Sequence, residues 1–149
     1  MPEKPTEFHL PRTFTLDHLD AWSEVADFLV NIEVKTVLLN GNLGAGKTTF
    51  VKYLVKALGA QDAVSSPTFS IVNTYESKEL KIYHMDLYRL ESYDELFNAG
   101  IEEYFYEDSA ICIVEWPDLI LESDLVDSAV TLNIEVIDGK RRVVVCIVD

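Results

Sequence analysis

One stretch of the sequence combines glycines, a lysine and a threonine at a spacing suited to holding phosphate. Gly41, Gly44, Gly46, Lys47 and Thr48 match the pattern G-x-x-x-x-G-K-[ST] in full. Glycines let backbone N–H groups approach an anion closely, and a helix that starts there directs the positive end of its dipole at the same place. The lysine would reach the β- and γ-phosphates, and the threonine hydroxyl would ligate Mg²⁺. The pattern predicts a nucleoside triphosphate site.

The residues on both sides of this loop have the periodicity that the motif requires. The apolar run 35–40 predicts a buried strand, and the stretch 49–58, followed by Gly59, predicts a helix. Guanine-specific proteins recognise their base with N-K-x-D, and the sequence has no such motif, so ATP is favoured. We expect ATP to contact Asn42, Leu43, Gly44, Ala45, Gly46, Lys47, Thr48 and Thr49.

Two carboxylates stand at the ends of predicted strands. Asp86 closes I-Y-H-M-D, and Glu115 closes I-C-I-V-E. In a parallel sheet the phosphates lie at the carboxyl ends of the strands, where an acid can hold Mg²⁺ directly or through water, or polarise an attacking water. The alternative for each is a capped or solvated carboxylate. Asp86 fits the first role less well if its strand is one arm of a hairpin.

Three further residues have two interpretations each. Thr68, on the loop after the phosphate-binding helix, could add a hydroxyl to Mg²⁺ as part of a nucleotide-sensing switch, or could belong to an ordinary turn. His84 is either a packed core histidine or a catalytic group. Arg89 could pair with Asp86 or reach a phosphate.

The remaining elements complete an α/β pattern. Periodicity predicts a helix over 17–30, hairpins over 68–86 and 130–148, a short helix from Ser92 to Gly100, and a buried strand over 110–115. This order predicts a three-layer sandwich like that of P-loop NTPases, with a mixed sheet of parallel core strands and antiparallel edge strands. We expect one domain over residues 1–149, with 1–13 as a loosely held arm.

The charge is distributed unevenly along the chain. The sequence has 26 acidic and 12 basic side chains, and the segment from Leu90 to Gly139 contains 14 acidic residues with no Lys or Arg. Nucleic acids and membrane surfaces are anionic, so this balance disfavours binding of either by the chain alone. The acidic half is either a solvated surface or a docking face for a basic protein.

The cysteines and the apolar runs bear on location. Cys112 and Cys146 each lie within an apolar run, which is typical of buried thiols. No apolar run approaches the roughly 20 residues that a membrane span needs, and the charged N-terminus does not resemble a signal peptide. We expect a cytoplasmic protein.

Four motifs in this order and spacing resemble the bacterial TsaE (YjeE) family: G-N-L-G-A-G-K-T-T, S-P-T-F, H-M-D-L-Y-R-L and V-E-W-P. The resemblance covers roughly residues 15–117. It implies an Mg²⁺-dependent ATPase that acts with the TsaB–TsaD pair, after TsaC has made threonylcarbamoyl-adenylate, in forming N6-threonylcarbamoyladenosine at position 37 of tRNAs that read ANN codons. It implies that tRNA is met only through those partners and that the chain alone is a monomer or weak oligomer.

The resemblance also assigns roles to residues. It implies that Lys47 and its loop hold ATP, that Thr48 and Glu115 ligate Mg²⁺, and that Asp17 lies by the adenine. It makes Ser66, Pro67 and Thr68 the first switch, and gives functional weight to Asp86 and Trp116.

The alternative function is a small-molecule kinase with an atypical lid. Kinases built on this loop usually close an arginine-rich lid over the transferring phosphoryl group. The sequence has no arginine between Arg89 and Arg141, which disfavours this alternative.

Overall fold

A seven-stranded sheet organises the described part of the chain. The computed structural model describes residues 10–42, 44–67 and 70–148. The strand order is β1-β7-β6-β2-β5-β4-β3. The strands are β1 (Arg12–Leu16), β2 (Thr36–Gly41), β3 (Val72–Glu76), β4 (Lys81–Asp86), β5 (Ala110–Glu115), β6 (Ala129–Ile137) and β7 (Lys140–Val148). Strands β4, β5, β2 and β6 pair in parallel, whereas β3, β7 and β1 join as antiparallel partners. The predicted mixed sheet with a parallel core is therefore confirmed.

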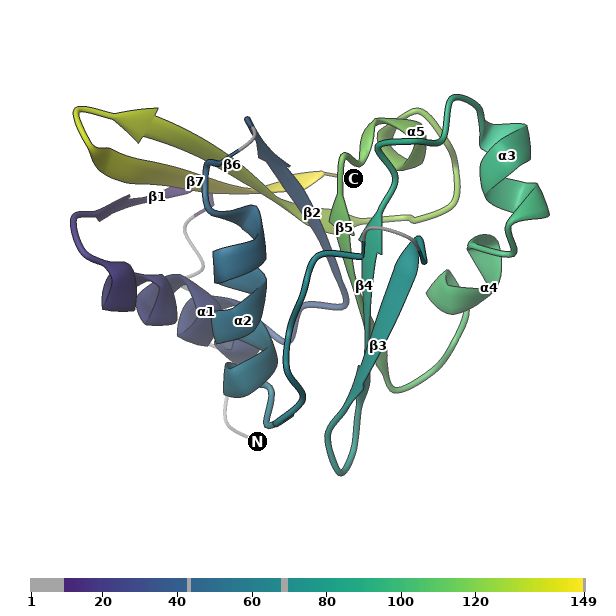
Figure 1. Cartoon of the computed structure of the whole chain (residues 1–149), viewed down its shortest axis with the longest axis horizontal. Coiled ribbons are helices and arrows are strands. Elements are labelled where there is room, and N and C mark those ends of the chain that lie inside the picture. The colour runs from purple at the N-terminus through teal and green to yellow at the C-terminus, as the bar shows by residue number, and fades with distance from the viewer. Residues whose placement is uncertain (1–9, 43, 68–69, 149) are drawn as a thin grey trace.

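Helices cover both faces of this sheet (Figure 1). One face is covered by α1 (Trp22–Asn31) and α2 (Lys47–Ala57), and the other by α3 (Tyr93–Asn98), α4 (Glu102–Phe105) and α5 (Asp118–Leu121). Successive side chains of a strand point to opposite faces of the sheet. Val37 and Leu39 of β2 therefore enter the apolar core under α1 and α2, and Leu38 enters the core under α3, α4 and α5. The predicted three-layer sandwich is confirmed.

Local sequence signals set several element ends. Asp138 and Gly139 both have positive φ, as the tight turn between β6 and β7 requires. Ser92 caps α3 by accepting a hydrogen bond from the Glu95 N–H, and Gly100 follows the helix at φ 74°. These signals predict the hairpin of β6 and β7 and the short helix α3, and the structure confirms both.

Other boundaries differ from prediction. The arm predicted over 1–13 is too long, because Arg12 and Thr13 belong to β1 and pair with Val145 and Val144 of β7. The predicted helix over 17–30 divides into a 3₁₀ turn, η1 (Leu19–Ala21), and α1. In the described residues, no helix is long and apolar enough to cross a bilayer.

The two cysteines differ in exposure. Cys112 is buried between the sheet and α4, but Cys146 on β7 is only half-buried, so the prediction of two buried thiols is wrong for the second. Burial raises the pKa of the Cys112 thiol to about 12. Near neutral pH its thiolate fraction is therefore far lower than that of an ordinary thiol.

We predict that a thiol reagent at pH 8 labels Cys146 of the native chain and leaves Cys112 unlabelled, because burial suppresses both access to Cys112 and its thiolate. Mass spectrometry after timed labelling checks this. A Cys146→Ser variant should stay unlabelled until it is unfolded in guanidinium chloride. Rapid labelling of that native variant would contradict the burial described for Cys112.

Candidate nucleotide site

The phosphate-binding motif forms the connection between β2 and α2. Gly46 is the residue that caps the start of α2, with φ 111°. A Cβ at this position would stand 2.8 Å from Cζ2 of the buried Trp22, which itself packs on Phe50. The positive φ and the lack of room for a Cβ therefore both require glycine at this position. The Trp22 ring packs directly against the loop at Gly46.

Lys47 is the first residue of α2, and only 6% of its surface is exposed. Its Nζ has no hydrogen-bond partner among the described residues and lies 3.9 Å from the centre of the Trp116 ring. Burial lowers the pKa of this ammonium, while the carboxylates of Glu115 and Asp86 oppose that shift. A buried cation without a hydrogen-bond acceptor fits a site for an anionic group such as a phosphate.

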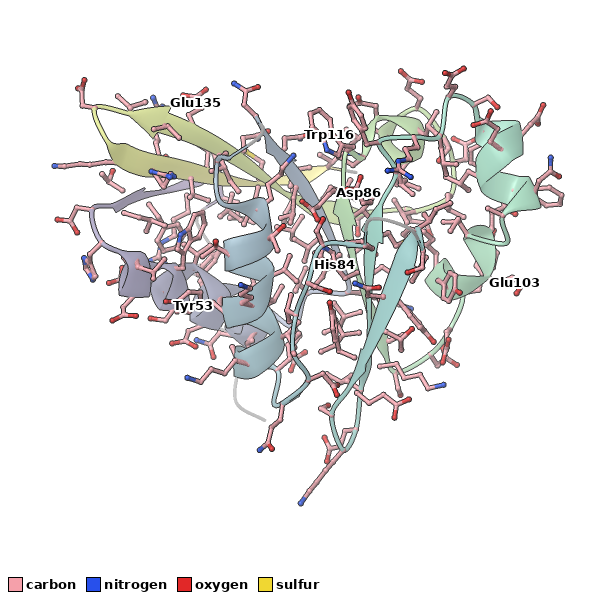
Figure 2. All side chains as sticks on the ribbon, viewed as in Figure 1. Tyr53, His84, Asp86, Glu103, Trp116 and Glu135 are labelled. Carbon is pink, nitrogen blue, oxygen red and sulfur yellow. The ribbon has the colours of Figure 1, made fainter. Side chains whose placement is uncertain are left out.

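Asp86 and Glu115 lie opposite one another at the ends of adjacent parallel strands. In the register of β4 and β5, Asp86 pairs with Glu115, and Glu115 also pairs with Leu39 of β2. Figure 2 shows Asp86 and Trp116 toward the end of the sheet from which the loop before α2 departs. Strand β4 is both a hairpin arm and a parallel strand, so the hairpin does not exclude Asp86 from this edge.

Glu115 also contacts His84. His84 is fully buried, and its Nε2 lies 2.7 Å from Oε2 of Glu115, which is 4% exposed. Asp86 is more open, and its Oδ1 accepts a hydrogen bond from the Tyr88 N–H. The two acids thus differ, since one is oriented by a buried histidine and the other stands nearer to solvent.

The oxygen donors at this edge fit a magnesium ion. Thr48 supplies a hydroxyl at the start of α2, and the two strand ends supply carboxylates. Within the part of the chain that the structure describes, no three His, Cys, Asp or Glu side chains cluster as a metal site. Mg²⁺ suits such a sparse donor set, because it keeps waters and binds through one or two protein oxygens together with substrate phosphates.

A pocket adjoins the phosphate-binding loop. This pocket of about 250 Å³ is lined by Leu16, Asp17, His18, Leu19, Trp22, Gly46, Thr49, Gly139 and Arg141. Asp17 therefore lines the same pocket as Gly46 and Thr49 of the loop region, and its carboxylate is 2.6 Å from Nδ1 of His18. Contact of Asp17 with an adenine stays a prediction.

The segment after α2 is fastened to β3 at Ser65. The backbone C=O of Ser65 accepts hydrogen bonds from the Tyr75 hydroxyl and from Nδ2 of Asn73, at 3.3 and 3.1 Å. Ser66 follows half-buried and Pro67 buried. Thr68 of the expected switch, and Leu43 of the expected nucleotide contacts, lie outside the described residues.

The comparison with known families decides the relationship. The model of the family "Threonylcarbamoyl adenosine biosynthesis protein TsaE" matches residues 16–144. The chain belongs to the TsaE family.

Individual relatives agree with this assignment. The chain is 39% identical to the tRNA threonylcarbamoyladenosine biosynthesis protein TsaE of Treponema pallidum, over 83% of this chain and 90% of the relative. It is 36% identical to the TsaE of Haemophilus influenzae, over 91% and 85% of the two chains. The crystal structure of Bacillus subtilis YdiB superposes with a TM-score of 0.72 at 29% identity, covering 91% of this chain and 84% of that one. None of these comparisons supports the small-molecule kinase alternative.

The phosphate-binding loop makes one contact that none of the four sequence motifs predicts. Nε of Arg141, on β7, donates a hydrogen bond of 3.0 Å to the backbone C=O of Ala45. The two residues are 96 positions apart, and Arg141 lies in no motif. Arg89, in contrast, is exposed, and no ion pair of the described residues joins it to Asp86.

We predict that Mg-ATP changes the fluorescence of Trp116, because a phosphate reaching Lys47 alters the contact between the ammonium and the indole. Titration of the wild-type chain with Mg-ATP measures the change. The matched control is Trp116→Phe, which keeps Trp22 as the single tryptophan and should lose the response. A response of equal size in Trp116→Phe would assign the signal to Trp22.

Proposed function

We propose that this TsaE-family chain binds and hydrolyses ATP with Mg²⁺ and thereby serves the formation of threonylcarbamoyladenosine in tRNA in the cytoplasm. The observation that carries the proposal is the buried ammonium of Lys47, which has no hydrogen-bond acceptor among the described residues and faces the two strand-end acids. Such a site is suited to a triphosphate carrying a divalent cation, because the acids and the phosphates share the metal while the lysine neutralises phosphate charge.

Each residue of the site then has a role. Lys47 binds the β- and γ-phosphates, and the N–H groups of the loop and of the first turn of α2 bind phosphate oxygens. The Thr48 hydroxyl and the Glu115 carboxylate hold Mg²⁺, which, when bound, supplies positive charge against the phosphate oxygens. Asp86, nearer to solvent, orients the attacking water. The pocket beside Asp17 receives the adenine.

We predict that Lys47→Met weakens ATP binding about 10- to 100-fold, the loss expected for removing a charge-assisted hydrogen bond of roughly 1.5–3 kcal/mol. Methionine keeps most of the buried volume and removes a desolvated charge, so the melting temperature should stay equal or rise. Calorimetric titration and thermal melts measure both. Lys52→Met, at an exposed position of the same helix, is the matched control and should bind ATP normally. Wild-type affinity in a folded Lys47→Met chain would refute the site.

We further propose that the TsaB–TsaD pair, named by the family resemblance, contacts the acidic half of the chain, and that tRNA is met only through these partners. Helices α3, α4 and α5 carry five acids of this half, and the exposed rings of Phe97 on α3 and Tyr106 just after α4 lie in the same segment. Figure 2 shows Glu103 on the outer side of α4, away from the sheet. Exposed aromatic rings among charged residues are typical of protein-binding surfaces.

Several acids of this half already have partners inside the chain, among them two near α4. Glu107 accepts a hydrogen bond from the Tyr83 hydroxyl and lies 3.5 Å from Lys81, and Glu102 accepts one from the Tyr93 hydroxyl. The Tyr83 bond lowers the pKa of Glu107. A test of docking should leave these two acids intact, because their removal would disturb α4 as well as the surface charge.

We predict that neutralising four exposed acids slows association with the partner complex several-fold and leaves ATP affinity unchanged, because rim charges act mainly on the association rate. The variant combines Glu103→Gln, Asp108→Asn, Glu122→Gln and Asp124→Asn. The control combines Glu24→Gln, Asp27→Asn, Glu76→Gln and Glu79→Gln, which remove the same charge from exposed positions elsewhere. Stopped-flow rates between about 0.05 and 0.5 M salt measure the effect. Equal rates for both variants would refute an acidic docking face.

A further inference from the structure

A histidine and a glutamate form a buried pair behind the site. His84 pairs with Ile113 in the register of β4 and β5, so Glu115, two residues farther along β5, projects from the same face as His84. Their side chains meet at 2.7 Å between Nε2 and Oε2. Ile113 belongs to the core under α1 and α2, so the pair lies on the face of the sheet that also carries Lys47.

The chemistry of the pair fixes the direction of the hydrogen bond. With Glu115 as a carboxylate, its Oε2 can only accept, so the Nε2–H of His84 donates the hydrogen bond. A neutral histidine then has an acceptor lone pair at Nδ1, and this atom is buried without a hydrogen-bond partner among the described residues. Leaving Nδ1 of a buried imidazole without a hydrogen-bond partner costs free energy, which is unusual for a residue that only fills the core. The other ring nitrogen, Nε2, contacts Glu115 of the candidate site.

The ring of His84 is held from its other side by β3. The Tyr75 ring lies 6.4 Å from the His84 ring, centre to centre, with 32° between the planes. The Tyr75 hydroxyl is itself fixed by Ser65, 3.4 Å from its N–H and 3.3 Å from its C=O. The histidine therefore has little freedom to turn away from Glu115, and the contact is preorganised by β3, β4 and β5 together.

We propose that His84 is a positioning residue, which holds Oε2 of Glu115 by its Nε2–H and so leaves Oε1 as the oxygen offered to the Mg²⁺ that accompanies the nucleotide. This inference rests on the proposed function. Groups that orient a metal-binding side chain typically change metal affinity 10- to 100-fold when they are removed, without touching the metal themselves.

Two amide variants separate the donor from the bulk of the ring. Glutamine at position 84 places its amide nitrogen near the place of Nε2 and keeps a donor within reach of Glu115. Asparagine is one methylene shorter and cannot reach it. The probe is Mn²⁺, whose binding to the chain with ADP is followed by electron paramagnetic resonance, and ADP binding in EDTA serves as the metal-free reference.

We predict that His84→Asn weakens Mn²⁺ binding 10- to 100-fold, that His84→Gln stays within a few-fold of the wild type, and that both bind ADP in EDTA as the wild type does. Wild-type Mn²⁺ affinity in His84→Asn would overturn the inference, and so would equal losses in both variants. Failure of the wild-type chain to bind Mn²⁺ with ADP would instead refute the proposed function, so the two failures are distinguishable.

A measurement on the wild-type chain needs no variant to fold. The chain has three histidines, His9, His18 and His84, so ¹⁵N-histidine spectra can be assigned with single substitutions at the first two. We expect His84 in the Nε2–H form, with ring signals that shift when Mg²⁺ is added to the ADP-bound chain. The Nδ1–H form, or signals that do not respond to Mg²⁺, would overturn the inference.

Discussion

The alignment of parallel strands at one edge is the constraint on which the site depends. Because β2, β4 and β5 run in the same direction, the loop that leaves β2 and the acids that end β4 and β5 reach the same edge of the sheet. The register then decides which side chains meet. A slip of one residue in β5 would turn Glu115 to the opposite face, toward α3–α5 and away from Lys47.

This edge concentrates groups that oppose folding. Lys47 is desolvated without a hydrogen-bond acceptor among the described residues, Glu115 is buried against a histidine, and Trp116 adopts a positive φ of 55°. Each feature costs free energy, which the two apolar cores on either side of the sheet must offset. Such a site persists because the packing around it holds these groups in place. A bound nucleotide would lower the free-energy cost of the unpartnered Lys47 ammonium.

Local signals made much of this architecture predictable. The glycine-rich loop with its lysine, the Asp138-Gly139 turn and the Ser92 cap each act within a few residues, so the sequence alone indicates them. The Asp86–Glu115 juxtaposition needed the parallel pairing of β4, which a hairpin pattern conceals. Strand β1 and the contact of Arg141 with Ala45 could not be predicted, because both depend on partners about 100 or more residues away.

The bond between Arg141 and the phosphate-binding loop has a consequence for biosynthesis. The loop ends at Thr48, yet the guanidinium that donates to its Ala45 C=O arrives only with β7. Strand β1 waits for that same strand, its neighbour in the sheet. A ribosome would therefore release β7 before the phosphate-binding loop gains its contact with Arg141. Until β7 has emerged, a nascent chain would hold this loop without the hydrogen bond from Arg141.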